Sequence, residues 1–335
     1  MRALVLEQPA PAAPGDAGPL RLLDLPDPAA GPGEVVLRVT ACGVCRTDLQ
    51  IAEGDLPARR LPIVPGHQPV GRVEAVGPGV EGWSVGDRAG AGWFGGSCGT
   101  CARCRSGREN LCDSAVFTGW DRDGGFAERI AVRADAAVRI PGGFADLDAA
   151  PLLCGGVIGY RALRLSGIEP GGRLGLYGFG ASALITIQVA RHWGCEVHVA
   201  TRSARERERA LALGAASVGG YDDAPPAPLD AAVTFAPVGS VVVAALRAVN
   251  RGGTVAINAI HLDGVPAFHY DLLWWERSIR SVANFTHRDA EELLALAAAI
   301  PIRTAVDRFP LEAGNDALAR LAAGEVEGAA VLEVA

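Results

Sequence analysis

The chain has 335 residues, 49% of them hydrophobic and 21% charged, a balance typical of a globular protein with room for two domains. Its formal net charge is -7, and acidic and basic residues are interspersed, so no basic stripe is available to bind a nucleic acid backbone. Every basic residue is arginine, which excludes P-loop, Schiff-base and other lysine-dependent catalytic sites.

The N-terminus has one basic residue and no apolar run long enough for a signal peptide. No later segment approaches the run of about 18 apolar residues that a membrane-spanning helix needs. We therefore predict a soluble, cytoplasmic protein without a membrane partner, and in that compartment cysteine thiols stay reduced.

Short alternating segments, separated by glycine and proline, run from about residue 20 to residue 141. Period-two alternation with frequent turn residues is typical of β-strands, so this part predicts a β-rich domain. The clearest strand candidates are EVVLRVT (34–40), GRVEAVG (71–77) and FAERIAVRAD (126–135).

Beyond this region, strand-like and helix-like segments alternate, which predicts a parallel, doubly wound sheet in an α/β protein. The expected strands lie within 173–180, 196–202, 230–236, 252–260 and 278–285, and the expected helices are 181–193, 204–213 and 241–250. An alanine-rich helix from residue 289 and a last segment, GAAVLEV (328–334), are expected to return to the first domain.

A cysteine cluster lies within the first domain with the spacing C-x2-C-x2-C-x7-C. Four thiolates satisfy tetrahedral zinc and leave no site for water, so this spacing predicts a structural zinc site. An iron-sulfur cluster, disulfides and an empty site are the alternatives. The four residues are Cys98, Cys101, Cys104 and Cys112.

A second constellation combines three separated motifs, ACGVCRTDLQ (41–50), PGHQPVGRVEAVGPGV (65–80) and LLCGGV (152–157). Together with the four-cysteine loop, they resemble the zinc-dependent medium-chain alcohol dehydrogenase family over essentially the whole chain. The resemblance implies a β-rich, GroES-like catalytic domain formed by residues 1–154 and completed by 287–335. It also implies a Rossmann cofactor domain at 155–286.

The resemblance also implies roles for individual residues. A catalytic zinc would be held by Cys45, His67 and Cys154, with the fourth place open to water or substrate oxygen. Thr47 matches the hydroxyl that hydrogen-bonds the alcohol, and Asp48 matches the carboxylate that orients the liganding histidine. Arg46 matches a position near the cofactor pyrophosphate, and the expected total is two zinc ions per chain. Cys42 and Cys195 match no ligand and are expected in the core.

Two positions depart from the family pattern. Gln68 stands where a glutamate is usual after the histidine, which removes a negative charge beside the metal; we interpret it as a tolerated variant. Gln50 stands where many members have a histidine that ends the proton relay. Because an amide does not titrate near neutral pH, we expect the proton to leave through water.

A G-x-G-x-x-A fingerprint follows the expected strand 173–180 and opens the expected helix 181–193. This is the context in which a dinucleotide pyrophosphate approaches a helix N-terminus. The candidate cofactor residues here are Gly178, Gly180, Ala181 and Ser182.

The next expected strand ends in arginine and serine where a site for NAD would carry an acidic residue. Arg202, Ser203 and Arg205 suit a 2′-phosphate, so NADP(H) is favoured over NAD(H). The alternative is that these arginines form salt bridges with Glu206 or Glu208 on the following helix.

The expected activity is reversible hydride transfer between a zinc-bound primary or secondary alcohol, or the matching aldehyde, and a nicotinamide. The alternatives are a zinc-free quinone or enoyl reductase on the same scaffold and a non-catalytic zinc and nucleotide-binding protein. The family resemblance further implies a homodimer or homotetramer built through the cofactor domain. Candidate residues for an apolar substrate pocket are Trp93, Phe94, Trp120 and Ile260.

Overall fold

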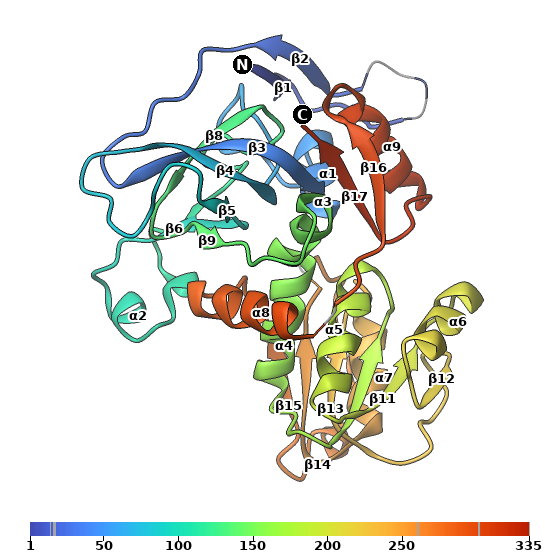
Figure 1. Cartoon of the computed structure of the whole chain (residues 1–335). Coiled ribbons are helices and arrows are strands. Elements are labelled where there is room, and N and C mark those ends of the chain that lie inside the picture. The colour runs from blue at the N-terminus through green and yellow to red at the C-terminus, as the bar shows by residue number, and fades with distance from the viewer. Residues whose placement is uncertain (14, 16–17, 260, 301, 335) are drawn as a thin grey trace. The chain divides into compact units, whose positions relative to one another are not determined.

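The computed structural model describes residues 1–13, 15, 18–259, 261–300 and 302–334. Contacts divide the chain into two compact units, which are described separately below (Figure 1). Unit 1 comprises Met1–Cys154, Thr286–Ala298 and Arg303–Ala335. Unit 2 comprises Gly155–Phe285 and Ala299–Ile302.

Unit 1 is built on a largely antiparallel sheet with the strand order β16-β17-β3-β4-β5-β9, in which β8 also pairs with β3. The C-terminal strand β17 runs antiparallel to β3, so the chain's last segment completes this sheet. The strands are β3 (Glu34–Val44), β4 (Pro69–Val76), β5 (Arg88–Gly90), β8 (Arg129–Arg133), β9 (Val138–Arg139), β16 (Val306–Pro310) and β17 (Ala329–Glu333). Smaller pairs join β1 (Arg2–Leu6) to β2 (Leu20–Asp24) and β6 (Phe94–Gly96) to β7 (Val116–Phe117).

The core of unit 1 lies against this sheet and includes Leu4, Leu37, Ile63 and Phe126, all of them fully buried. Burying large apolar side chains in this way is the main stabilising contribution to the unit. Its helices are α1 (Arg46–Glu53), α2 (Ala102–Arg105), α3 (Asp146–Ala149), α8 (His287–Ala299) and α9 (Gly314–Ala323), and its 3-10 turns are η1 (Glu109–Leu111), η2 (Ala150–Leu153) and η4 (Leu311–Ala313).

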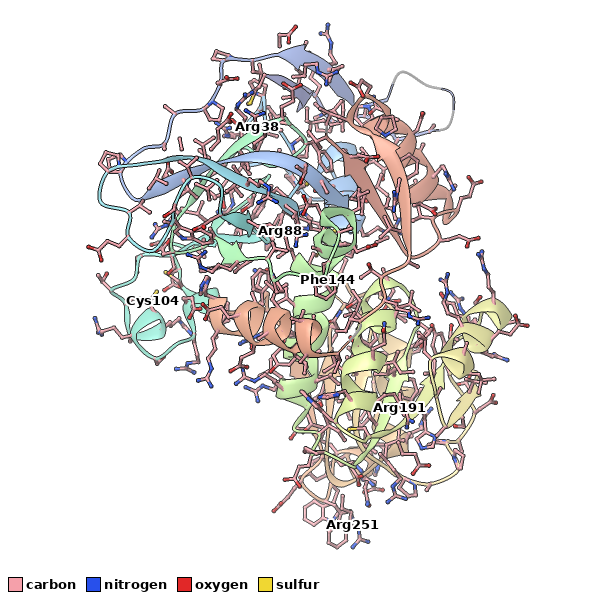
Figure 2. The ribbon with its side chains drawn as sticks, viewed as in Figure 1. Arg38, Arg88, Cys104, Phe144, Arg191 and Arg251 are labelled. Atoms are coloured by element: carbon pink, nitrogen blue, oxygen red, sulfur yellow. The ribbon has the colours of Figure 1, made fainter. Side chains whose placement is uncertain are left out.

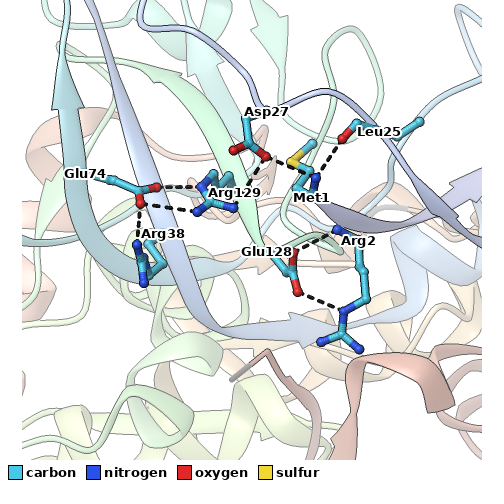
Figure 3. A network of polar contacts seen from close by, with 8 residues as sticks. All are labelled: Met1, Arg2, Leu25, Asp27, Arg38, Glu74, Glu128 and Arg129. Atoms are coloured by element: carbon cyan, nitrogen blue, oxygen red, sulfur yellow. Dashed lines mark hydrogen bonds and ion pairs between the residues drawn. The ribbon is translucent and has the colours of Figure 1, made fainter.

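Ion pairs link neighbouring strands on the surface of unit 1 (Figure 3). Glu74 on β4 accepts hydrogen bonds from Arg38 on β3 and from Nε of Arg129 on β8, the latter at 2.7 Å. Glu128 accepts from both the backbone and the side chain of Arg2, each at 2.8 Å. The guanidinium groups of Arg129 and Arg38 lower the pKa of Glu74.

Unit 2 is a parallel sheet with the strand order β12-β11-β10-β13-β14-β15. Its inner strands are almost continuously buried, as expected when helices cover both faces of a parallel sheet. The strands are β10 (Arg173–Tyr177), β11 (Glu196–Ala200), β12 (Ser217–Gly219), β13 (Leu229–Thr234), β14 (Val249–Ile257) and β15 (Ser278–Ser281). The helices are α4 (Gly155–Ser166), α5 (Ala181–His192), α6 (Ala204–Ala212) and α7 (Gly239–Ala248), with a 3-10 turn η3 (Tyr270–Leu272).

The predicted fold class, a β-rich domain with a doubly wound parallel sheet, is confirmed. The sequence analysis named no helix at α1, α4 or α9. Glycines lower the intrinsic helix propensity at the start of α4, and the first residues of α1 belong to a motif that was interpreted for its chemistry. Among the described residues, no helix has the length and apolarity required to cross a bilayer.

Candidate functional site

The motif around Cys45 folds as the N-terminus of helix α1. Cys45 is the N-cap: its Sγ accepts a hydrogen bond from the Thr47 amide at 3.4 Å. The Cys45 amide in turn donates to Oδ2 of Asp48 at 2.9 Å, which completes a capping box. A local helix start therefore determines where the thiol and the carboxylate lie.

His67 precedes strand β4 and is almost completely buried. Its Nδ1 lies 3.0 Å from Oδ1 of Asp48, and the same oxygen accepts the Gly66 amide at 3.2 Å. Because Nδ1 donates to this carboxylate, Nε2 is the ring nitrogen that is left to bind a metal. Gly66 has φ 94, and a Cβ there would clash with the Phe126 ring, so this tight approach requires glycine.

Cys154 follows the turn η2 and completes a three-residue cluster. Nε2 of His67 lies 3.4 Å from Sγ of Cys45 and 3.4 Å from Sγ of Cys154. Zinc bonds of ordinary length would place tetrahedral nitrogen and sulfur ligands about 3.6 Å apart. The donor set and its spacing therefore fit zinc, with one coordination position left for a non-protein ligand.

The electrostatics of this cluster favour a positive ion. Burial by itself lowers the pKa of His67, but the Asp48 carboxylate and Cys45 outweigh burial and raise that pKa well above its usual range. The hydrogen bond to Cys154, together with burial, raises the pKa of the Cys45 thiol. A metal that binds here must therefore displace protons, so its affinity rises with pH.

Two neighbouring side chains present polar atoms without protein partners. Thr47 is a buried residue as a whole, and its hydroxyl makes no hydrogen bond among the described residues. Gln68 is 3% exposed, and its Nε2 has no partner in the same part of the chain. The Gln68 side chain packs over Gly43, where any Cβ would meet its amide.

The four-cysteine motif forms a separate cluster around α2 (Figure 2). Sγ of Cys104 lies 3.5 Å from that of Cys101 and 3.9 Å from that of Cys98, and Cys112 Sγ lies 3.5 Å from Cys98. These separations exceed a disulfide bond and approach the edges of about 3.8 Å expected around tetrahedral zinc. Backbone amides of Thr100 and Cys101 lower the pKa of Cys98 to about 6, which favours the thiolate form.

A pocket of about 510 Å³ opens in unit 2 where the strand order reverses between β10 and β13. Such switch points are where doubly wound sheets bind nucleotides. Gly178 has φ 92, and a Cβ there would lie 2.9 Å from the Ala236 amide, so the turn requires glycine. Of the predicted cofactor residues, the pocket is lined by Gly178, Gly180, Ala181, Ser182, Arg202 and Ser203.

Glu206, Tyr221 and Asn258 also line this pocket and were not among the predicted cofactor residues. Oδ1 of Asn258 is buried and has no partner among the described residues, as a nucleotide-binding atom awaiting a donor would be. Tyr221 lies two residues after β12, and burial raises the pKa of its phenol. Position just after the carboxyl end of a strand could have drawn attention to Tyr221 and Asn258, whereas Glu206 lies in the first turn of α6.

At the far end of the pocket, Ser203 caps α6 by accepting the Glu206 amide at 3.2 Å. Thr201 donates its hydroxyl hydrogen to the Glu206 carboxylate. Arg202 pairs with no carboxylate among the described residues, so the alternative of a salt bridge from Arg202 to Glu206 or Glu208 is not formed. Arg205 does not line the pocket, and Arg46 is an exposed residue of unit 1.

Of the substrate-pocket candidates, Trp93 lies beside His67, with ring centroids 5.1 Å apart and planes at 85°. Trp120 stacks on Trp93 at 5.8 Å. Phe94 is buried and makes none of Trp93's ring contacts within the described residues. Ile260 lies outside the described residues.

Comparison with known proteins finds two family models in this chain. Residues 31–142 match the alcohol dehydrogenase GroES-like domain, and residues 181–299 match the zinc-binding dehydrogenase domain. A probable alcohol dehydrogenase, AdhA, of Mycobacterium tuberculosis is 49% identical over 95% of this chain and 94% of its own length. The aldehyde reductase AdhA of Synechocystis is 33% identical over 91% of this chain and 93% of its own.

The solved structures include similar folds. A thermostable alcohol dehydrogenase from Pyrobaculum aerophilum, solved with cobalt and zinc bound, superposes with a TM-score of 0.89 at 26% identity. That match covers 100% of this chain and 99% of the other.

Proposed function

This chain belongs to the zinc-dependent medium-chain alcohol dehydrogenase family, and from that premise we propose which residues carry out its reaction. The reaction is reversible hydride transfer between an alcohol and a nicotinamide cofactor. The proposed catalytic zinc ligands are Cys45, His67 and Cys154. The observation that carries this assignment is the meeting of their three donor atoms with His67 Nε2 3.4 Å from both sulfurs.

When bound, zinc would act as a Lewis acid toward the alcohol oxygen, and the nicotinamide would exchange the hydride. Asp48 holds the proton on Nδ1 of His67, which keeps Nε2 aimed at the metal position. Thr47 Oγ1 would accept the alcohol's proton while it gives up its own hydroxyl proton. Because Gln50 does not titrate, that proton leaves through water.

A second zinc, held by Cys98, Cys101, Cys104 and Cys112, has a structural role in this proposal. Four protein sulfurs complete a tetrahedron, so no position is left for a substrate. The cluster also lies on a lobe with few buried apolar side chains, where a metal can replace the core that the lobe lacks.

For the cofactor, we propose NADP(H) over NAD(H). Arg202 lines the nucleotide pocket without a carboxylate partner, and the Ser203 hydroxyl is free to donate because it only accepts from the Glu206 amide. Arg205 would add charge nearby. The competing feature is Glu206, whose carboxylate could instead accept hydrogen bonds from a ribose hydroxyl, as a site for NAD requires.

We also propose a homo-oligomer assembled through unit 2. Strand β15 pairs with β14 on one side and has no strand on its other side among the described residues. Nearby, Tyr270, Trp274 and Trp275 are at least half exposed, and Arg251 lies 3.9 Å above the Trp275 ring (Figure 2). An open edge beside exposed aromatic rings is typical of a surface that another subunit covers.

The experiment that tests the proposal is reduction of benzaldehyde by the zinc-loaded protein with NADPH and NADH at equal concentration. We expect turnover that is lost when a chelator removes zinc, and faster turnover with NADPH. A preference for NADH would indicate that the Glu206 carboxylate accepts hydrogen bonds from the ribose hydroxyl of the cofactor. Turnover that survives zinc removal would favour a zinc-free reductase, and no turnover on a panel of alcohols and aldehydes would favour a non-catalytic protein.

A further inference from the structure

An aromatic cluster in unit 1 begins at the proposed metal site. The edge of His67 meets Trp93 at 5.1 Å. Trp93 then stacks on Phe117 at 5.3 Å and on Trp120 at 5.8 Å, with interplanar angles of 20° and 25°. The Phe117 and Trp120 rings lie 5.8 Å from each other. The Phe117 and Trp120 planes are tilted at 41°, and each of these rings stacks on Trp93. The three rings form an aromatic wall (Trp93, Phe117 and Trp120) that starts at a proposed zinc ligand.

Arg59 closes the outer end of this wall. Its guanidinium carbon lies 4.0 Å above the Trp120 ring and 5.9 Å from the Phe117 ring, within cation–π range. Its Nη1 donates to Oδ1 of Asp121 at 2.9 Å. Arg59 is therefore held by a ring face and a carboxylate at the same time.

Asp121 and Trp120 link the segment carrying Arg59 to the wall's own backbone. Oδ2 of Asp121 accepts the Phe117 amide at 2.8 Å. Nε1 of Trp120 donates to the Pro57 carbonyl at 2.9 Å. The segment 55–62 has no helix or continuous strand, so these contacts are what hold it against Trp120.

The Arg59 side chain is 51% exposed, and exposed ion pairs contribute little to folding stability. Its contacts nonetheless converge on one ring that stacks directly on Trp93. A guanidinium suits this role because it is planar, so it can stack and hydrogen-bond together, which an ammonium cannot. The contacts of Arg59 therefore fix the position of the Trp120 ring more than they stabilise the fold.

We propose that Arg59 is a positioning residue that makes the site prefer flat aromatic alcohols and aldehydes over saturated ones of equal size. It holds Trp120, and through it the stacked Trp93 ring, in place beside His67. A planar substrate ring gains stacking on such a wall, whereas a puckered ring of the same size gains apolar contact alone. This inference rests on the proposed function, because it assumes that the carbonyl reacts at the His67 cluster.

The test compares benzaldehyde with cyclohexanecarbaldehyde, which differ in flatness while having the same carbon skeleton. For the wild type we expect a kcat/KM ratio of about 2- to 10-fold in favour of benzaldehyde, the range that aromatic stacking supplies. Arg59→Met keeps the length of the side chain but removes the charge and the bond to Asp121. It should reduce that ratio toward one, chiefly by raising the KM for benzaldehyde.

Arg60→Met is the matched control, because Arg60 is the adjacent arginine, pairs with Asp123 instead and makes none of the wall's ring contacts in the described part of the chain. It should leave the ratio unchanged. Arg59→Lys should restore part of the preference. If Arg59→Met fails to fold, Asp121→Asn removes the same ion pair while keeping an oxygen for the Phe117 amide.

Three outcomes overturn the inference: a wild-type ratio near one, an Arg59→Met ratio equal to that of the wild type, or an equal change in Arg60→Met. In each of these the wild type still turns over both aldehydes, so the proposed function stands. If the wild type reduces neither these nor any other aldehyde or alcohol, the proposed function itself is wrong and this inference fails with it.

Discussion

The two cysteine-containing clusters of unit 1 differ in how they are built. The four-cysteine cluster is formed by one short segment, with Cys98 exposed, and its sulfurs are hydrogen-bonded mainly by amides of the same segment. The cluster at His67 draws on three distant segments and is backed by the buried carboxylate of Asp48. All four sulfurs of the first cluster therefore come from neighbouring positions in the sequence. The donor atoms of the second cluster meet only when the domain is folded.

Cys154→Ser should break the second cluster most severely. Because it removes one of three ligands at the open site, we expect the zinc-dependent rate to fall by more than about 100-fold. The melting temperature should stay within a few degrees of the wild type, since the surrounding core is unchanged. Activity and thermal unfolding of the same zinc-loaded sample would check this; retained activity would show that Cys154 is not a ligand.

Cys104→Ser should have the opposite effects, a lower melting temperature and a largely retained activity. Loss of a metal that stabilises an otherwise weakly packed lobe should lower the melting temperature by about 5–10 °C, while the folded fraction keeps most of its activity. Differential scanning calorimetry and metal content per chain would measure both effects. If Cys104→Ser inactivates the protein without lowering its melting temperature, the division into catalytic and structural clusters is wrong.

Asp48→Asn should weaken zinc binding at the His67 cluster and leave the four-cysteine cluster unchanged. The single oxygen of the amide can still accept from the Gly66 backbone, but the bond from the Cys45 amide to the second carboxylate oxygen is lost, and no full charge fixes the proton on Nδ1 of His67. We expect zinc affinity at this site, or activity, to fall by about 10- to 100-fold. Titration with a chromophoric chelator should show one weakened zinc and one unchanged; equal weakening of both would contradict the prediction.

Glu74→Gln provides a baseline from a part of unit 1 that holds no metal ligand. Arg129 and Arg38 lower the pKa of Glu74 in the folded state, so its ion pairs stabilise the protein above the ordinary glutamate pKa (Figure 3). That contribution is lost as the pH falls through the lowered pKa. At pH 7 we expect the substitution to lower the unfolding free energy by less than about 1 kcal/mol. Below the lowered pKa of Glu74, the variant and the wild type should have the same unfolding free energy. Urea unfolding at both pH values would measure it.

Much of the fold could be predicted because the local sequence patterns favour the same helices and strands that the packed structure contains. The helix expected at 181–193 is α5, Ala181–His192, and the expected strands of the second half all lie in one parallel sheet. Helix α4 was not predicted, because three of its first five residues are glycines and tertiary packing overrides their low propensity. Trp93 and Trp120 were predicted for one pocket wall, but their neighbours Phe117 and Arg59 were not, because side-chain stacking leaves no periodic signal in a loop.

By itself, the sequence determined the family, the fold class and the residue types able to bind zinc and a nucleotide, because spacing between cysteines and between glycines is a local property of the chain. The tertiary structure decided which of these residues lie close together in space. Cys154 lies 87 positions from His67, yet their donor atoms are 3.4 Å apart, and Tyr221 and Asn258 reach one pocket from separate strands. Such contacts depend on the closure of long loops around a packed core, and neither periodicity nor composition records which loops will close together.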